Sequence, residues 1–278
     1  MKIDAAWFLE RASGAPLDRP IPRRLFLQGC LAGLLAPSLP GCGGDGIPAG
    51  PQEEEGLPFR LTARPGDPTT EPPSGLVSLG IGDSRDGLLY VPEGYDPALP
   101  PPLFVALHGA GGSAENWQSY PPRAEDRNMV FLAIDSRGVT WDVIRGAYGP
   151  DVRFLNRALE HTFERCRIDP ERIALGGFSD GATYALSLGL VNGDLFTHLV
   201  GYSPGFVVRP DPPAGEPTIF VSHGTDDPVL SVETTRSEIV PGLRDGGYDV
   251  TFLEFDGGHG VPSEISEQAL DWFLEEAV

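Results

Sequence analysis

Three short segments carry residue types that together could perform nucleophilic catalysis. Residues 177–181 read Gly-Phe-Ser-Asp-Gly, a G-x-S-x-G pattern whose glycines permit a tight strand-to-helix turn that exposes the hydroxyl of Ser179. Two neighbouring aspartates, Asp226 and Asp227, and a histidine, His259, follow further along the chain. Because a serine hydroxyl is a poor nucleophile by itself, it needs a histidine base that a carboxylate orients. We therefore predict that Ser179 is a nucleophile and that His259 accepts its proton.

The elements expected around these segments place them at one edge of a sheet. Apolar runs suited to buried strands occur at about 87–91, 102–107, 129–135, 172–177, 198–203, 217–222 and 248–255. Amphipathic segments alternate with them, at 151–166, 180–191, 232–246 and 262–277. This alternation is typical of an α/β fold, a mostly parallel twisted sheet with helices on both faces. Because the candidate residues follow the carboxyl ends of strands, we expect them to meet in one cleft.

Together, these motifs and their order resemble the α/β-hydrolase superfamily. Residues 108–112 read His-Gly-Ala-Gly-Gly, 169–173 Asp-Pro-Glu-Arg-Ile, 223–229 His-Gly-Thr-Asp-Asp-Pro-Val and 257–259 Gly-Gly-His. The order serine, aspartate, histidine is that of the α/β-hydrolases. From about Gly75 to Val278 the chain resembles small bacterial esterases grouped with phospholipase/carboxylesterase and polyhydroxybutyrate-depolymerase-like proteins. The resemblance implies hydrolysis of carboxylic esters by a Ser-His-Asp acyl-enzyme mechanism.

The resemblance also implies individual roles. In similar esterases an H-G-x-x-D segment supplies the acid, which corresponds to Asp227, although the residues alone leave Asp226 open. The oxyanion donors would be the backbone N–H groups of Ala110 and Asp180. Between the strand that ends near Tyr202 and the next strand at Thr218 only residues 203–217 remain, Ser203 to Pro217, too few for a large cap domain. We therefore expect an open cleft that takes accessible acyl esters.

Other functions remain as alternatives to a carboxylesterase or phospholipase-like esterase. Similar cores act on polymers, so a polyester depolymerase or feruloyl-type esterase is the first alternative, and a serine peptidase is a weaker one. A catalytically silent, ligand-binding lipoprotein is the alternative from another class. The intact set of Ser179, Asp227 and His259 argues against it. No histidine or cysteine spacing indicates a metal site, and we expect no cofactor.

Several further residues have a structural and a functional interpretation. We expect His108 and His223, each before a glycine at a strand end, to hold active-site loops, and Cys166 to be buried filler. Three aromatic residues could border the cleft or pack inside the domain: Trp117, Trp141 and Tyr148. Three arginines could meet a substrate charge or serve only solubility: Arg137, Arg145 and Arg153.

The N-terminal part has the pattern of an export signal. Residues 22–28 read Pro-Arg-Arg-Leu-Phe-Leu-Gln, which suggests twin-arginine export, and the apolar run that follows is too short to span a bilayer. Residues 39–42 read Leu-Pro-Gly-Cys and resemble a bacterial lipobox. The sequence therefore predicts a signal peptide at 1–41, lipidation of Cys42, a flexible tether at 42–74 and a catalytic domain at 75–278. We expect a lipoprotein of the bacterial envelope, periplasmic or on the cell surface.

The charge of the chain excludes some partners. The net charge is −20, and residues 1–41 contain five basic and three acidic side chains, so cleavage makes it more negative still. Such a surface repels nucleic acid and anionic lipid. The expected partner is a small-molecule or polymeric ester, with membrane contact through the lipid anchor only.

Overall fold

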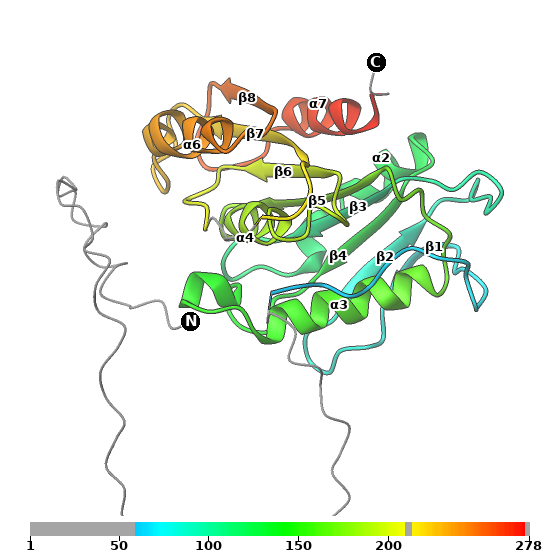
Figure 1. The fold of residues 1–278 in the computed structure, drawn as a ribbon. Helices are drawn as coiled ribbons and strands as arrows, with labels where there is room; N and C mark the ends of the chain where they lie inside the picture. The colour runs from blue at the N-terminus through cyan, green and yellow to red at the C-terminus, as the bar shows by residue number, and fades with distance from the viewer. Residues whose placement is uncertain (1–58, 209–212, 276–278) are drawn as a thin grey trace, which may run out of the picture. The chain divides into compact units, whose positions relative to one another are not determined.

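The computed structural model describes residues 59–208 and 213–275 (Figure 1). The predicted signal peptide, Cys42 and the first part of the tether lie outside the described residues. Within the described residues no helix is both long and apolar enough to cross a membrane.

Eight strands form one sheet in the order β1-β2-β4-β3-β5-β6-β7-β8 (Figure 1). The strands are β1 (Gly75–Ser78), β2 (Gly87–Val91), β3 (Leu103–Leu107), β4 (Val130–Ile134), β5 (Ile173–Phe178), β6 (His198–Tyr202), β7 (Thr218–Gly224) and β8 (Val250–Phe255). From β4 across to β8 all neighbours are parallel, whereas β1 and β2 pair antiparallel at one edge. The carboxyl ends of the parallel strands therefore lie along one side of the sheet.

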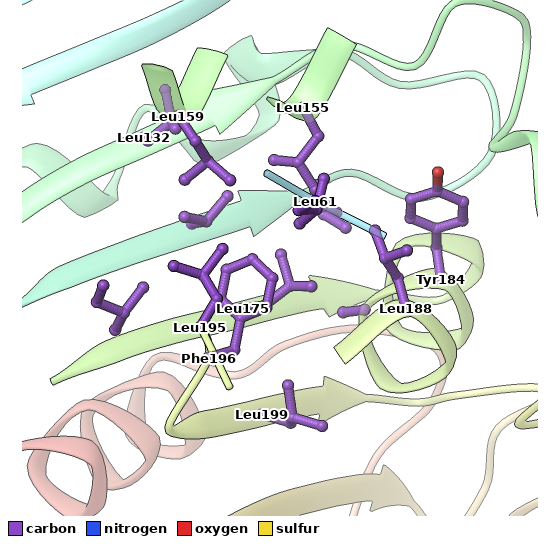
Figure 2. Packing of buried hydrophobic residues seen from close by; sticks show 14 of the residues in the cluster. Leu61, Leu132, Leu155, Leu159, Leu175, Tyr184, Leu188, Leu195, Phe196 and Leu199 are labelled. Carbon is purple, nitrogen blue, oxygen red and sulfur yellow. The ribbon is translucent and has the colours of Figure 1, made fainter. Parts of the chain in front are cut away.

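Helices cover both faces because the central strands are apolar at every position. In β3, Leu103, Val105 and Leu107 face one core cluster, while Phe104 and Ala106 face the other. The first cluster takes in α3 (Pro150–Phe163), α4 (Asp180–Gly189) and α6 (Val240–Asp245), and Figure 2 shows part of it. The second takes in α2 (Tyr120–Asp126) and α7 (Ser263–Leu274).

Shorter helical turns complete the connections. They are η1 (Ala114–Trp117), η2 (Asp142–Arg145), α5 (Val232–Thr234) and the π-helical turn η3 (Thr235–Ile239). Between β6 and β7, residues 203–208 and 213–217 form neither helix nor strand. The described part of this connection therefore holds no cap helix.

The predicted fold class is confirmed, and the seven predicted strands correspond to β2 through β8. The prediction lacks β1, α2 and the short turns η1 and η2. The edge strand β1 is only four residues long and half-exposed, so it lacks an apolar run. Helix α2 contains two prolines in its first turn, where proline is compatible with a helix but interrupts the apolar pattern.

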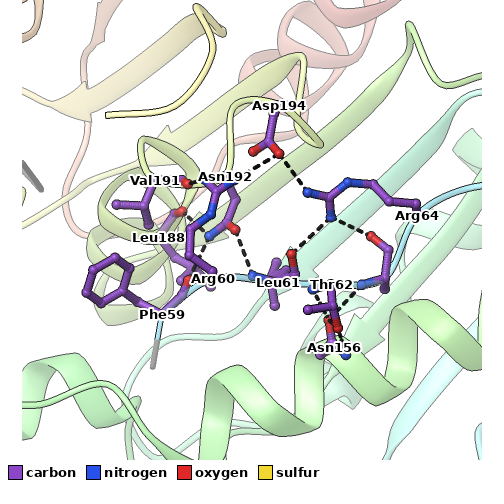
Figure 3. Close-up of polar contacts among 11 residues, drawn as sticks. Phe59, Arg60, Leu61, Thr62, Arg64, Asn156, Leu188, Val191, Asn192 and Asp194 are labelled. Carbon is purple, nitrogen blue, oxygen red and sulfur yellow. Dashed lines mark hydrogen bonds and ion pairs between the residues drawn. The ribbon is translucent and has the colours of Figure 1, made fainter. Parts of the chain in front are cut away.

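The prediction of a flexible tether at 42–74 is wrong for residues 59–64, which we name the strap (Figure 3). The side chain of Leu61 is 2% exposed and lies in the first core cluster, as Figure 2 shows. The backbone of the strap is held by side-chain amides far away in sequence: Asn192 accepts the N–H of Leu61, and Asn156 accepts those of Thr62 and Ala63.

Ion pairs reinforce the strap. Arg60 and Arg64 both contact the carboxylate of Asp194, at 2.9 and 2.6 Å (Figure 3). The partners lie on α3 and in the connection that follows α4, more than 90 residues away. A pattern that reads only local sequence cannot detect such a contact, so the composition of residues 42–74 indicated a tether throughout.

Candidate active site

Ser179 occupies a sharp turn between β5 and α4. Its backbone has φ 56° and ψ −118°, a region that a residue other than glycine rarely adopts. A Cβ added at Gly177 would lie 2.3 Å from the carbonyl of Gly181, and one at Gly181 would lie 2.2 Å from the carbonyl oxygen of Leu107. Both glycines are therefore required for the close contact of strand and helix that forms the turn.

The structure brings the three predicted catalytic side chains into a hydrogen-bonded chain. The Nε2 atom of His259 is 2.9 Å from the Oγ atom of Ser179, and its Nδ1 atom is 2.6 Å from Oδ2 of Asp227. With the ring proton on Nδ1, His259 donates to the carboxylate and accepts from the serine hydroxyl. This arrangement makes Nε2 available as a base for the serine proton.

The carboxylate of Asp227 is fully buried and fixed by its own loop. Its Oδ1 atom accepts the backbone N–H groups of Val229 and Leu230, at 2.8 and 2.9 Å. Burial alone would raise the pKa of Asp227, but the bonds from Leu230, His259 and Val229 together lower it below its usual value. Asp226 instead lies exposed, with its N–H bonded to the carbonyl of Gly257. Only Asp227 contacts the histidine.

A second histidine touches the same carboxylate, a contact that sequence reasoning missed. The Nε2 atom of His223 is 3.2 Å from Oδ2 of Asp227 and 2.9 Å from the carbonyl oxygen of Leu230. Its Nδ1 atom is 2.8 Å from the hydroxyl of Thr235, and the side chain is completely buried. The expected loop-holding role is present, and the four-residue spacing to Asp227 is the signal that could have revealed the additional contact.

The loop of residues 108–112 is fixed from behind. The Nε2 atom of His108 accepts the N–H of Ser136, and the carbonyl of His108 accepts the indole N–H of Trp141. Burial lowers the pKa of His108, which therefore remains neutral at pH 7. Gly111, with φ 70°, donates its N–H to the carbonyl of Val139 at 2.7 Å. The loop is thus held rigidly beside the serine turn.

The two predicted oxyanion donors lie beside Ser179. Asp180 is the first residue of α4, directly after the serine, and Ala110 is exposed in the glycine loop. Neither backbone N–H donates to another residue in the described part of the chain. Both groups are therefore unpaired donors at the carboxyl edge of the sheet. The carboxylate of Asp180 is itself engaged by the hydroxyl of Thr140.

The aromatic candidates separate into two groups. Trp117 lines a pocket beside the serine turn, whereas Trp141 is fully buried, with its ring centroid 5.1 Å from that of Tyr184. Tyr148 packs against Phe59 and Tyr184, on the side of the strap. Only Trp117 therefore borders the cleft; the other two serve packing.

None of the remaining candidates, three arginines and Cys166, lines the pocket. The Arg137 guanidinium lies 3.5 Å from the ring centroid of Phe154 and donates to backbone carbonyls, so it is not free to meet a substrate. Arg145 and Arg153 are exposed. Cys166 is fully buried, as expected, and burial raises its pKa to about 12, so it holds no thiolate at neutral pH.

The pocket has a volume of about 240 Å³. Its walls come from the β3–α2 connection, α2, the residue before Ser179, and the segment after His259. The lining residues are His108, Asn116, Trp117, Ser119, Tyr120, Arg123, Phe178, Val261, Ser263 and Ser266. Phe178 also contacts the ring of His259, with 4.7 Å between the ring centroids. The pocket therefore opens beside the hydrogen-bonded serine and histidine.

The chain is similar to known esterases. Residues 152–272 match the family model described as Phospholipase/Carboxylesterase. The chain is 25% identical to Feruloyl esterase C of Emericella nidulans over 67% of this chain and 82% of that protein. It is 33% identical to Acyl-protein thioesterase 1 of Gibberella zeae over 36% of this chain and 46% of that protein.

A solved structure shows the same fold. The butyrate-bound esterase Est2 from Thermogutta terrifontis superposes with a TM-score of 0.54 at 18% identity, covering 72% of this chain and 92% of that one. The mostly parallel eight-stranded sheet and the serine turn after β5 define an α/β-hydrolase. The chain is a serine esterase of this superfamily, a hydrolase of carboxylic esters.

Proposed function

We propose that Ser179, His259 and Asp227 carry out ester hydrolysis through an acyl-enzyme. His259 takes the proton of Ser179 as its Oγ atom attacks the ester carbonyl, and Asp227 holds the imidazole and stabilises its positive charge. His259 then gives this proton to the departing alcohol oxygen. Water repeats the sequence on the acyl-enzyme and releases the carboxylic acid, which restores Ser179.

The developing oxyanion would be stabilised by the backbone N–H groups of Ala110 and Asp180. Both are unpaired donors, and the N-terminus of α4 adds the favourable end of its dipole. The observation that carries the proposal is the continuous hydrogen-bonded chain from Ser179 through His259 to Asp227, with distances of 2.9 and 2.6 Å.

For the substrate, we propose a carboxylesterase or phospholipase-like activity on accessible small esters. The description of the matching family supports this choice, as does the lack of a cap helix in residues 203–208 and 213–217. The similarity to Feruloyl esterase C supports the alternative of a phenolic ester, and the similarity to Acyl-protein thioesterase 1 supports a thioester. A polyester depolymerase shares the same catalytic requirements.

Hydrolysis of p-nitrophenyl esters from acetate to palmitate, together with methyl ferulate and an acyl thioester, tests these choices. The wild-type chain should hydrolyse a subset, and Ser179→Ala should lower kcat by about 10⁴-fold or more because it removes the nucleophile. The chain length with the largest kcat/KM measures the acyl site. A folded wild type that hydrolyses none of them would instead favour a silent, ligand-binding protein.

We further propose that the protein is an envelope lipoprotein anchored by a lipid on Cys42. The support is the Arg-Arg-Leu-Phe-Leu pattern followed by the lipobox-like Leu-Pro-Gly-Cys. Mass spectrometry of membrane-extracted protein should find a mature N-terminus at a diacylated Cys42, and Cys42→Ser should remain unlipidated. A full-length product in the soluble fraction would contradict the proposal.

A further inference from the structure

The pocket beside the serine turn lies on the side of the histidine. Phe178 contacts the His259 ring, and Val261 and Ser263 follow His259 directly in the chain. None of its lining residues comes from the connection after β6 or from residues 226–230 around the acid. The pocket therefore occupies the α2 and α7 side of the hydrogen-bonded chain.

The chemistry of ester cleavage decides which part of the substrate belongs there. In the tetrahedral intermediate, the alcohol oxygen must lie near Nε2 of His259, because this atom gives it a proton as the bond to carbon breaks. The central carbon carries four substituents: the Oγ atom of Ser179, the oxyanion, the alcohol oxygen and the acyl group. Because the alcohol oxygen occupies the position beside His259, the acyl group points in a different direction. A pocket bounded by the residues that flank His259 thus adjoins the alcohol.

The walls of the pocket combine aromatic faces with unpaired hydrogen-bond donors. Trp117, Tyr120 and Phe178 supply the rings, with Trp117 and Tyr120 packed edge to face at 4.8 Å. Among the described residues, the indole N–H of Trp117, the side-chain amide N–H₂ of Asn116 and the hydroxyl of Ser119 donate to no acceptor. The indole N–H is buried, which makes its lack of an acceptor costly.

The pocket does not suit an anion. Arg123, its one lining arginine, is paired with Glu267 at 2.6 Å and donates to the hydroxyl of Ser263 at 2.8 Å. Its positive charge is therefore compensated inside the protein. The volume of about 240 Å³ is small for a ligand pocket and leaves room for one ring-sized group.

We propose that this pocket binds the alcohol part of the ester, and that the preferred alcohol is a neutral, oxygen-rich, ring-sized group such as a sugar or a substituted phenol. This inference rests on the proposed function. The aromatic faces contact the ring, while its oxygen atoms accept hydrogen bonds from Trp117, Asn116 and Ser119. An aliphatic alcohol gains no such bonds.

The test compares two ester series in the full chain. One series keeps the acetyl group and varies the alcohol among ethanol, n-hexanol, hydroquinone and methyl glucoside. The other keeps ethanol and varies the acyl group from acetyl to octanoyl. Val261→Phe partly fills the pocket from a half-buried position, and Trp117→Phe removes one N–H but keeps a ring. Leu99→Phe, at a site 71% exposed and outside the pocket, is the matched control.

The ratio of variant to wild-type kcat/KM for each ester removes differences in intrinsic reactivity. Val261→Phe should lower this ratio at least tenfold for the hydroquinone and glucoside acetates relative to ethyl acetate, and Trp117→Phe should lower it about three- to tenfold. The acyl series and the deacylation rate constant, measured after the alcohol has left, should change less than twofold. Leu99→Phe should resemble wild type throughout.

Two results would overturn the inference. A change that follows the acyl series would make the pocket an acyl site, and an equal decrease for every ester would leave it no role in selecting the alcohol. If Val261→Phe does not fold, Trp117→Phe alone decides the question. The proposed function fails separately, if Ser179→Ala retains wild-type turnover; a strict dependence on Ser179 with no alcohol selectivity refutes only the subsite.

Discussion

The carboxyl edge of the sheet and the strap are both fixed by hydrogen bonds from side chains distant in sequence. The backbone of the edge is strained, whereas that of the strap carries a side chain into the core. At the edge, Ser179 and Ser203 have φ values of 56° and 51°, which is a strained region for residues other than glycine. The strap is tied down by Asn156 and Asn192 and buries Leu61 in the core. One region stores strain, and the other supplies burial.

This difference indicates which residues should affect turnover and which should affect the free energy of unfolding. Strained backbone near a reactive group persists because the surrounding structure stabilises it, and such strain typically costs about 1–3 kcal/mol per residue. No hydrogen bond or ring contact joins residues 59–64 to the serine, the acid or the histidine. Substitutions at the edge should therefore change turnover with little effect on unfolding, whereas substitutions in the strap should do the reverse.

The largest expected effect is at the acid. Asp227→Asn keeps the shape of the side chain but favours the wrong tautomer of His259, so kcat should fall by about 10⁴-fold. The free energy of unfolding should change far less, because the amide oxygen can still accept the N–H groups of Val229 and Leu230. Steady-state kinetics and urea unfolding measure the two quantities. Asp226→Asn is the matched control, and a comparable loss there would contradict the assignment of the acid.

The second effect is at the strap. Leu61→Ala removes a side chain that is 2% exposed, and a truncation of this kind costs about 2–5 kcal/mol of unfolding free energy. The kcat of the folded variant should equal that of wild type, since the strap is separate from the hydrogen-bonded chain at the edge. Thr62→Ala, at an exposed position, removes only a side-chain hydrogen bond with Asn156 and should cost about 1 kcal/mol or less. A large fall in kcat for Leu61→Ala would couple the two regions.

The same contrast explains what could be predicted from the sequence. The serine turn depends on five adjacent residues, 177–181. Gly177 and Gly181 avoid a steric clash within the turn and its neighbouring strand, so the pattern predicts the geometry of the turn. The loop of Asp227 is also contiguous. In the strap, Leu61 meets Asn192 across 131 positions, and no local pattern encodes such a contact. Local patterns therefore indicated which segments meet at the edge of the sheet, but they placed the domain boundary too late.

The third effect concerns His223, which lies against Asp227 at the catalytic edge. The Nε2 atom of His223 is hydrogen-bonded to the carbonyl oxygen of Leu230 and lies 3.2 Å from Oδ2 of Asp227. His223→Leu removes this bond, worth about 0.5–1.5 kcal/mol, and loosens the loop that positions the acid, so kcat should fall up to about tenfold. KM should change little, because His223 lies behind the acid and away from the substrate. His223→Gln, which retains an N–H donor, should recover part of the loss. Equal kcat values for the Leu and Gln variants would reduce His223 to a packing role.

The smallest effect concerns the buried carboxyl of Asp142, in the turn η2. Asp142 is 8% exposed, and burial, together with the nearby charge of Asp151, raises its pKa to about 6 from an ordinary value near 3.8. The folded protein therefore binds a proton at this site more tightly than the unfolded chain does. Its contribution to stability is complete below about pH 3.8 and is lost as the pH rises toward 6.

Asp142→Asn should remove this dependence. The amide oxygen still accepts the N–H groups of Gly149 and Asp151, but no charge has to be buried. The variant should gain unfolding free energy relative to wild type as the pH rises from 4 to 7, and the two should converge at pH 4. Urea unfolding across this range measures the difference between them. Asp142 begins the turn η2, just after Val139 and Trp141, which are hydrogen-bonded to the 108–112 loop. A gain in stability at constant kcat would show that removing the charge of Asp142 does not disturb the catalytic edge. A pH-independent difference would instead mean that Asp142 keeps an ordinary pKa in the folded protein.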